Sequence, residues 1–457
     1  MNSLIQDDRD HLIHPVASWK EHERRGVTVL ESGQGAYVKD IHGRSLLDGF
    51  SGLWCVNLGY GQQTIVQAAA QQMAKLPYVT GYFHFSSEPT IRLATKLAAL
   101  APGDLNRVFF TQGGSDAVDS AVRIIQYYFN VQGRPGKKHM IALQRGYHGS
   151  TTIASGLTGL ATFHNRFDAP APTQHHIPIP YPYRSEHGSD PAAIIKASVA
   201  TLKQKVAALG AENVAAFFCE PVQGSGGVIV PPRGWLSAMR QACRELDILF
   251  VADEVITGFG RTGPLFGCEY DGVEPDMMTL AKGLTSAYAP MGAVMLSERI
   301  YRTIADSTPA GEVVGHGFTY SGHPVCAAVA LEALRLYVEG GILENGQKVG
   351  AYFEERLAGF AGHALVGDVR ARGLLAAVEL VTNKSTKEKP RPELGFSDLI
   401  ARLGYENGLI FRAFSDGTVG FAPPLCCSRA DIDLLIERFG KTLDDTLNVK
   451  EVRNAIA

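Results

Sequence analysis

The sequence predicts an α/β protein with a mainly parallel β-sheet covered by helices on both faces, and a second, smaller unit toward the C-terminus. The first observation is that short apolar strands alternate with helical segments from about residue 107, the pattern of a parallel sheet. The second is that two strands, near residues 248–252 and 277–281, are unbroken apolar runs, as buried strands are. The third is that long helices precede the strands again from about residue 331.

The N-terminal part of the chain reads as an arm followed by a strand meander. Residues 1–25 predict an irregular arm that ends in a short amphipathic piece, and residues 26–50 predict three strands separated by glycine turns. The apolar loop SGLWCVNLGYG follows, and its aromatic Trp54 looks exposed. Apolar spacing then predicts helices over residues 62–76 and 87–101.

The alternating region and the C-terminal unit follow in order. Strands are expected at residues 107–111, 139–144, 214–221, 247–254, 277–282 and 292–297, with helices at 116–130, 191–209 and 233–246. Later helices are expected at residues 323–341, 345–360, 396–408 and 429–447, and later strands at 372–381, 409–414 and 418–425. We divide the chain into an N-terminal part of a small domain (1–60), a large domain (61–330) and a C-terminal small domain (331–457).

Composition narrows the classes of function. The 43 basic and 46 acidic residues give a net charge of −3, which argues against the concentrated basic face of a nucleic-acid-binding protein. The seven cysteines have no paired spacing, so we expect reduced core thiols rather than disulfides or a zinc site. The N-terminus lacks a signal-peptide pattern, and no apolar run reaches transmembrane length. We therefore expect a cytoplasmic protein with no membrane partner.

Two residues at strand ends carry the first chemical signal. Asp253 ends one apolar run and Lys282 ends another. A lysine becomes a nucleophile when burial keeps its amine neutral, and a buried carboxylate requires a cationic or hydrogen-bonding partner. The alternatives are a surface lysine and a turn or capping acid. Glu254 should face away from Asp253 because strand side chains alternate, which argues against a pair of glycosidase carboxylates.

Two further loops follow strands of the same predicted sheet. Gly113, Gly114 and Ser115 lie between a strand and a helix, where free N–H groups suit a phosphate; the alternative is an ordinary cap by Ser115 or Asp116. The loop GYHG offers Tyr147 to stack on a flat ring, or simply as a packed turn aromatic, and a histidine such as His148 is more often structural.

One motif is a false signal. Residues 258–263 read GFGRTG and follow a strand, which matches the GxGxxG of dinucleotide-binding proteins. PLFG follows instead of a helix, so the motif lacks its required context. No nucleophile elbow, HExxH pair or Walker lysine loop is present.

Taken together, the motifs resemble the class III (ω-type) aminotransferases, which use pyridoxal phosphate. The resemblance runs from the HP pair at residues 14–15 to residues 422–425. It rests on SGLWCVNLGYG, GGSDAVD, GYHGST, CEPVQGSGGVIVPP, VADEVITGFGRTG, LAKGLTSAYAPMGAV, GHGFTYSGHPVCAA and IFRAF…GFAPPL. The first and last of these look most like members that use pyruvate as amino acceptor, such as the ω-amino acid, β-alanine and putrescine transaminases.

The resemblance implies a fold and a set of site residues. The fold would be that of aspartate aminotransferase (fold type I), with a seven-stranded sheet in the large domain and an α+β small domain built from both termini. Lys282 would hold pyridoxal 5'-phosphate covalently and later move a proton, and Asp253 would pair with the pyridinium nitrogen. The other implied cofactor-binding residues are Gly114, Ser115, Tyr147, His148, Glu220 (with Gln223 beside it), Val255 and Thr319.

The resemblance also implies partners and a substrate pocket. Thr319 would reach the phosphate of a second subunit, which implies a homodimer with shared active sites, possibly a tetramer, and no metal. The implied substrate-binding residues are Trp54, Tyr82, Phe83, Phe318 and Arg412, the last as a carboxylate clamp. The alternatives are core packing for the aromatic residues and a surface ion pair for the arginine. Many relatives read SGSEAN at the phosphate loop, whereas this chain reads GGSDAV at residues 113–118. We therefore expect the phosphate to depend more on backbone N–H groups.

The implied reaction moves an amino group from an ω-amino acid, diamine or other amine to pyruvate. Alternatives that stay open are 2-oxoglutarate as acceptor, a mutase, decarboxylase or racemase on the same scaffold, and a non-catalytic relative of the fold. The physiological donor is not indicated by any motif.

Overall fold

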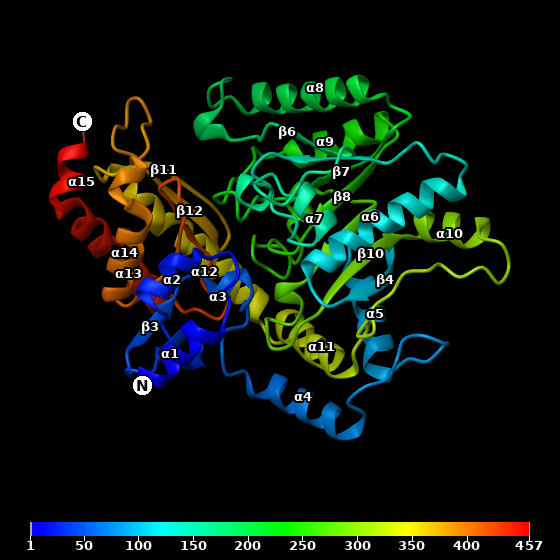
Figure 1. The fold of residues 1–457 in the computed structure, drawn as a ribbon, viewed down its shortest axis with the longest axis horizontal. Coiled ribbons are helices and arrows are strands. Elements are labelled where there is room, and N and C mark those ends of the chain that lie inside the picture. Colours follow the sequence, from blue (N-terminus) through cyan, green and yellow to red (C-terminus); the bar gives the residue numbers. More distant parts are fainter. Residues whose placement is uncertain (1, 457) are drawn as a thin grey trace.

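The computed structural model describes residues 2–456, which form three β-sheets with helices around them. The N-terminal segment (blue) and the C-terminal helices (orange to red) lie together on one side in Figure 1, and the largest sheet lies on the other. This arrangement is the large domain and the small domain from both termini that the resemblance implies.

The large sheet has seven strands in the order β4-β10-β9-β8-β7-β5-β6. Neighbouring strands from β9 to β6 pair in parallel, and β10 pairs antiparallel with both β9 and β4. The strands are β4 (Leu105–Thr111), β5 (His139–Leu143), β6 (Gln174–Ile177), β7 (Val214–Cys219), β8 (Leu249–Asp253), β9 (Met277–Leu280) and β10 (Gly292–Ser297).

Helices cover both faces of this sheet. Adjacent residues of β7 show this directly, because Phe217 and Phe218 belong to different hydrophobic clusters on opposite faces. The helices of this part are α4 (Gln63–Lys75), α5 (Glu88–Leu100), α6 (Gly114–Val131), α7 (Thr152–Leu157), α8 (Pro191–Leu209), α9 (Trp235–Glu245), α10 (Glu298–Ser307) and α11 (Pro324–Val338). Short 3-10 turns are η1 (Ala161–Phe163), η2 (Pro182–Arg184), η3 (Gly267–Asp271) and η4 (Lys282–Leu284).

The remaining elements form two four-stranded sheets, in the orders β1-β2-β3-β13 and β11-β12-β15-β14. Strand β3 pairs in parallel with β13, with Leu47 opposite Leu409, which joins the two ends of the chain. The N-terminal elements are α1 (Asn2–His11), α2 (Trp19–Arg25), β1 (Leu30–Gln34), β2 (Tyr37–Asp40), β3 (Ser45–Asp48) and α3 (Ser51–Trp54). The C-terminal elements are α12 (Ile342–Ala358), η5 (Gly359–Gly362), β11 (Val366–Arg372), β12 (Leu375–Leu380), η6 (Pro392–Leu394), α13 (Phe396–Glu406), β13 (Leu409–Ile410), β14 (Arg412–Ala413), β15 (Thr418–Phe421), α14 (Arg429–Asn448) and α15 (Lys450–Ala455).

Several sequence-based expectations need correction. The arm is not irregular throughout, since α1 occupies residues 2–11. Trp54 is not exposed: only 3% of it is accessible, and its ring packs edge-on against Phe50. Strands β6 and β11 and helix α10 were not expected. The predicted domain boundary between residues 330 and 331 falls inside α11, and the domain limits stay predictions.

Two other expectations concern the cysteines and the membrane. All seven cysteines are free, and Cys219, Cys243, Cys268 and Cys427 are buried as core thiols, whereas the other three are half-buried. Among the described residues, no helix combines the length and the apolar character that a membrane span needs.

Candidate functional site

A cavity of about 130 Å³ lies where the carboxyl ends of the parallel strands meet. Ligands in open α/β sheets bind at this edge. The loops that follow β4, β5, β7, β8 and β9 all contribute side chains to it. The lining residues are Gly114, Ser115, Tyr147, His148, Gly149, Glu220, Asp253, Val255, Ile256 and Lys282. The structure therefore brings eight of the nine predicted cofactor-binding residues together.

Lys282 presents a free amine to this cavity. It directly follows Ala281, the residue after β9, and begins the short turn η4 with φ +45°, a left-handed conformation that costs a non-glycine residue about 1 kcal/mol or more. Within residues 2–456, its Nζ atom has no hydrogen bond or ion pair, and it lies 5.8 Å from the centroid of the Trp54 ring. Burial lowers the pKa of Lys282, and Asp253 opposes that shift. The burial of the amine thus shifts it toward the neutral form that a nucleophile needs.

Asp253 is 2% exposed and is held from three sides at the end of β8. One oxygen, Oδ1, accepts hydrogen bonds from the Val255 N–H and from the Thr279 hydroxyl, both at 3.1 Å. The other, Oδ2, lies 2.7 Å from Nδ1 of His148. Such a fixed, buried carboxylate can pair with a cation in the cavity.

His148 and Glu220 extend this buried polar network. Burial acts to lower the pKa of His148, but its hydrogen bond to Asp253 and the charges of Asp253 and Glu220 raise it overall. Burial also raises the pKa of Glu220 to about 7, although His148 acts against this. The Glu220 carboxyl accepts hydrogen bonds from the N–H groups of Tyr147 (2.9 Å) and Gly224 (2.8 Å), so it fixes the loop that carries Tyr147.

The start of α6 forms an uncapped cradle at one end of the cavity. The N-cap residue is Gly113, and no side chain caps the helix, so the alternative of a cap by Ser115 or Asp116 is wrong. Among the described residues, the N–H groups of 114–116 have no hydrogen-bond acceptor. The Ser115 hydroxyl faces the GYHG loop, where it accepts a hydrogen bond from the Ser150 N–H at 3.1 Å. Unpaired N–H groups at a helix start favour an anion.

Tyr147 and Val255 line the cavity between the amine and the cradle. The Tyr147 ring packs against Phe163 with 5.1 Å between centroids, and its hydroxyl lies 3.1 Å from Ser150 Oγ. Val255 lies under Gly114: a Cβ on that glycine would meet the two Val255 methyl carbons at 3.0 and 3.1 Å. The cradle and the wall are therefore packed against each other.

Glu254 points away from the cavity, as expected from strand alternation. Its carboxyl accepts hydrogen bonds from the Gly267 and Cys268 N–H groups at 2.8 and 2.7 Å. Residues 258–263 form turns that no helix follows, so the dinucleotide motif remains without its structural context. Both findings agree with the sequence analysis.

The structure does not bring Thr319, Tyr82, Phe83 or Phe318 to the cavity. Thr319 lies in an exposed turn, where its carbonyl oxygen accepts a hydrogen bond from the Tyr78 hydroxyl at 2.9 Å. Phe83 is 81% exposed, beside Tyr82. The two segments that carry these residues lie side by side, because the Tyr82 hydroxyl lies beside Gly317 and the Tyr78 ring contacts Tyr320. We call their aromatic side chains the aromatic patch, formed by the exposed Tyr78, Tyr82, Phe83, Phe85 and Tyr320 and the half-buried Phe318. An exposed apolar patch of this kind typically marks a protein interface.

Arg412 and Trp54 are connected through Phe414. The Trp54 ring stacks on Phe414 with 6.3 Å between centroids, and the Arg412 guanidinium lies 5.5 Å from the Phe414 centroid. Arg412 forms no ion pair with any of the described acidic residues, which removes the alternative of a surface ion pair. A stack of Lys282, Trp54, Phe414 and Arg412 thus leads from the cavity to an unpaired cation.

Sequence reasoning missed three residues of the site. Gly149 and Ile256 line the cavity, and Thr279 supports Asp253. Gly149 and Ile256 each lie within two residues of a predicted site residue on the same loop, which is the signal that identifies them. Thr279 required the pairing of β8 with β9, which places it opposite Asp253.

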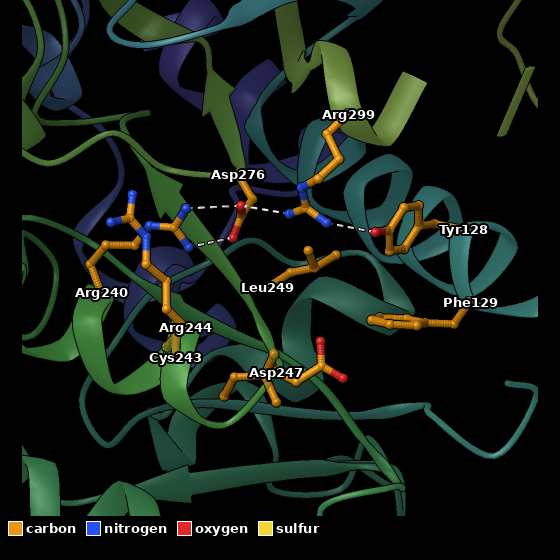
Figure 2. Close-up of a pocket in the computed structure, with 10 residues that line it drawn as sticks. Tyr128, Phe129, Arg240, Cys243, Arg244, Asp247, Leu249, Asp276 and Arg299 are labelled. Carbon is orange, nitrogen blue, oxygen red and sulfur yellow. Dashed lines mark hydrogen bonds and ion pairs between the residues drawn. The ribbon is translucent and has the colours of Figure 1, made fainter. Parts of the chain in front are cut away.

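A second cavity, of about 290 Å³, lies at the opposite edge of the sheet, near the starts of β8 and β9. Figure 2 shows Asp276 between Arg240 and Arg299, with Tyr128 beyond Arg299. Both arginines are paired with the same carboxylate at 2.6 and 2.8 Å. These charges are already satisfied, and no amine nucleophile faces the cavity, so we place the reactive chemistry at the first one.

Comparisons with known proteins agree with this geometry. The family model described as "Aminotransferase class-III" matches residues 19–443. The chain is 42% identical over 439 residues to putrescine–pyruvate aminotransferase of Pseudomonas aeruginosa, covering 96% of this chain and 95% of that protein. It is 37% identical over 460 residues to diaminobutyrate–2-oxoglutarate transaminase of Halomonas elongata, covering 99% and 98%. It matches the crystal structure of an (S)-enantioselective ω-transaminase from Thermomicrobium roseum with a TM-score of 0.95 at 40% identity, covering 98% and 99%.

Proposed function

Because the chain belongs to the class III aminotransferases, which are pyridoxal-phosphate-dependent transaminases, we propose that it moves an amino group from an ω-amino acid, diamine or other amine to pyruvate. The donor leaves as an aldehyde or ketone, and pyruvate becomes alanine. One amino group and one carbonyl oxygen change places, so no external oxidant or reductant is needed.

The residues of the cavity fit the cofactor. The unpartnered Lys282 amine suits an aldehyde, the buried Asp253 carboxylate suits a protonated ring nitrogen, and the uncapped N–H groups of α6 suit a phosphate. Tyr147 and Val255 would cover the two faces of the ring. When bound, the cofactor supplies an electron sink for the carbon next to the transferred nitrogen.

Each side chain then has a defined task. Lys282 supplies the amine that holds the cofactor, and once released it carries a proton between two carbon atoms through its Nζ. Asp253, oriented by His148, Thr279 and the Val255 N–H, keeps the ring nitrogen protonated. Glu220 holds the Tyr147 backbone in place, and the buried setting excludes water from the reacting atoms.

Arg412, at the end of the stack, would determine which amino acceptor the enzyme prefers, because it would bind the acceptor's carboxylate. A guanidinium binds one carboxylate in a bidentate manner, and Arg412 is a cation without an acidic partner among residues 2–456. Pyruvate has one carboxylate and matches one such group, whereas 2-oxoglutarate has two. The Pseudomonas aeruginosa relative is named for pyruvate and the Halomonas elongata relative for 2-oxoglutarate, so both acceptors belong in the test.

We place the enzyme in a homodimer. The aromatic patch is the surface that a second copy would cover, and the Thr319 hydroxyl of each subunit would reach the phosphate in the other. Tyr82, Phe83 and Phe318 would then join Trp54 in the substrate pocket across the interface.

Two experiments test the function. In Lys282→Ala, the visible absorption of the lysine-bound cofactor should disappear, and alanine formation from pyruvate should cease; retention of the band would contradict the assignment of Lys282. Alanine should form when pyruvate is supplied with a panel of amines that includes β-alanine and putrescine. If no donor yields alanine from pyruvate but glutamate forms from 2-oxoglutarate, the acceptor is 2-oxoglutarate and not pyruvate.

The clamp is tested by separating the two halves of the reaction. Arg412→Ala should slow the half with pyruvate more than the half with an uncharged amine, by at least about tenfold for a lost charge-assisted pair of 1.5–3 kcal/mol. Arg402→Ala, on the exposed face of α13, is the matched control and should leave both halves unchanged. If Arg412→Ala slows both half-reactions equally, the substitution has damaged the site in general and the clamp is not supported.

A further inference from the structure

Three side chains of types that can bind a metal ion lie close together in the N-terminal segment. Asp8 lies on α1, His14 in the following loop and His22 on α2. One ligand atom from each lies within 4.8 Å of the other two. Among the residues that the structure describes, no other trio of histidine, cysteine, aspartate or glutamate side chains is this close.

The distances suit a small metal ion. Asp8 Oδ2 lies 2.9 Å from His14 Nε2, and Asp8 Oδ1 lies 3.0 Å from His22 Nε2. Tetrahedral ligands at bond lengths of 2.0–2.1 Å are about 3.3 Å apart. The three ligand atoms lie within 4.8 Å of one another, so shifts of under about 1 Å in the side chains bring them to this spacing around a central ion. The imidazole rings are tilted by 43° at 4.5 Å between centroids, and each Nε2 atom lies next to one oxygen of the carboxylate.

Two buried atoms of the cluster face each other without a hydrogen bond. Asp8 Oδ1 and His22 Nε2 lie 3.0 Å apart as an ion pair, but neither forms a hydrogen bond with any described residue. Buried polar atoms normally find partners. The side chains of Asp8 and His22 are each 13% exposed, and that of His14 is 29% exposed. A bound ion would satisfy the two orphaned atoms and keep a solvent-facing position for a fourth, water ligand.

We propose that Asp8, His14 and His22 form a binding site for a divalent transition-metal ion of the zinc type. Two imidazoles and one carboxylate are ligands that Zn²⁺ accepts, whereas Ca²⁺ and Mg²⁺ prefer oxygen alone. Three protein ligands with an open fourth position distinguish the site from a closed structural zinc centre.

The ion would brace the arm near the cofactor cavity. Residues 13–19, which include the second ligand and most of the segment leading to the third, line a further cavity of about 800 Å³, and Ser150 and Phe163 also line it. Ser150 and Phe163 are the side chains that contact Tyr147. Fixing His14 and His22 to Asp8 would hold this segment in place, so metal occupancy would stabilise the arm next to the mouth of the active site.

The test measures metal directly and does not depend on turnover. Holoenzyme without an affinity tag is dialysed against chelator, and Zn²⁺ is titrated by calorimetry with the metal content measured per chain. We expect one Zn²⁺ per chain, with affinity at least about 100-fold lower in His22→Gln or Asp8→Asn, since losing a ligand costs more than losing its second-shell partner. Cofactor absorbance checks that each variant is folded.

Matched controls lie on the same helix. His11→Gln and Asp10→Asn change exposed residues of α1 and should bind Zn²⁺ as the native chain does. Zn²⁺ should also slow tryptic cleavage after Arg9 and Lys20 in the native chain and not in His22→Gln. No Zn²⁺ binding, binding that persists in the ligand variants (for instance at a cysteine), or equal losses in His11→Gln would overturn the site. Cleavage unaffected by bound Zn²⁺ would overturn the bracing of the arm.

Discussion

Replacing Gly114 with alanine tests whether the cradle at the start of α6 and the wall at Val255 form one packed unit. The new Cβ would lie 3.0 and 3.1 Å from the two Val255 methyl carbons, inside the ordinary contact range of 3.4–4 Å. The backbone of Gly114 is helical, so alanine is otherwise the better residue by about 0.5–1 kcal/mol. The clash predicts that Gly114→Ala is unfavourable, whereas the helix preference predicts that it is favourable.

The magnitude follows from the size of the overlap. Inserting a methyl group into a packed site costs typically 1–3 kcal/mol, and helix preference offsets about 0.5–1 kcal/mol of this. Since Val255 and the start of α6 both line the cavity proposed to hold the cofactor, we expect most of the remaining 1–2 kcal/mol to appear in cofactor binding. This corresponds to an affinity for pyridoxal phosphate roughly 5- to 30-fold weaker.

The assay is a titration of pyridoxal phosphate into apoprotein, followed by tryptophan fluorescence. Gly113→Ala is the matched control, because a Cβ there meets no protein atom within 4 Å. Val255→Ala removes both methyl groups, so the double variant Gly114→Ala/Val255→Ala should recover about 1 kcal/mol relative to the sum of the single changes. Equal affinities for Gly114→Ala and Gly113→Ala, or strict additivity in the double variant, would refute the packing argument.

Three other predictions rest on separate features. The raised pKa of Glu220, about 7 against a usual 4.5, means that the folded state binds the extra proton between these values, so stability falls as pH rises from about 4.5 to 7. The native apoprotein should lose up to about 3 kcal/mol relative to Glu220→Gln over this range in urea unfolding, and a constant difference would contradict the shift. Arg261 is fully buried and donates to Pro423 O, Asn57 Oδ1 and Ser51 Oγ. Arg261→Leu should cost about 3–5 kcal/mol because it leaves buried acceptors unpaired, at about 1–3 kcal/mol each, whereas the exposed Arg402→Ala should cost less than about 1 kcal/mol; similar midpoints in denaturant would argue against this. Thr319→Ala should speed cofactor loss on dialysis without changing the visible absorption of the bound form, and unchanged retention would remove Thr319 from the phosphate site.

The convergence of Asp253 and Lys282 on one cavity could be predicted because it arises where local pattern and fold coincide. Apolar runs identify β8 and β9, and the first polar residues after such runs, Asp253 and Lys282, must lie at one edge of a parallel sheet. Paired glycines after β4 likewise favoured a helix start with free N–H groups, with a cap by Ser115 or Asp116 as the alternative that the structure removes. These inferences need only the strand directions, which the alternation of strands and helices supplies.

What the sequence did not predict depends on distant contacts. Strand β6 has the sequence QHHI, with polar residues at three of four positions, and it lies at the edge of the sheet. It therefore has no apolar run from which a strand could be predicted. Trp54 looks exposed in its own loop, but Phe414 from the other end of the chain covers it. The aromatic patch shows the reverse case: Phe83 is apolar and yet exposed, because a single chain has nothing to cover it. The roles assigned to Thr319, Phe83 and Arg412 stay predictions.

The parallel pairing of β3 with β13 also constrains how the protein is made. The Ser51 hydroxyl donates to the carbonyl of Ala422, a partner 371 positions later in the chain. A ribosome adds about 5–20 residues per second, so this partner emerges roughly 20–75 s after its donor. For most of that interval Leu47, which is fully buried in the finished protein, has no β13 to pair with. We therefore expect the N-terminal strands of the nascent chain to remain incompletely paired, and accessible to chaperones, until the last tenth of the chain is being synthesised.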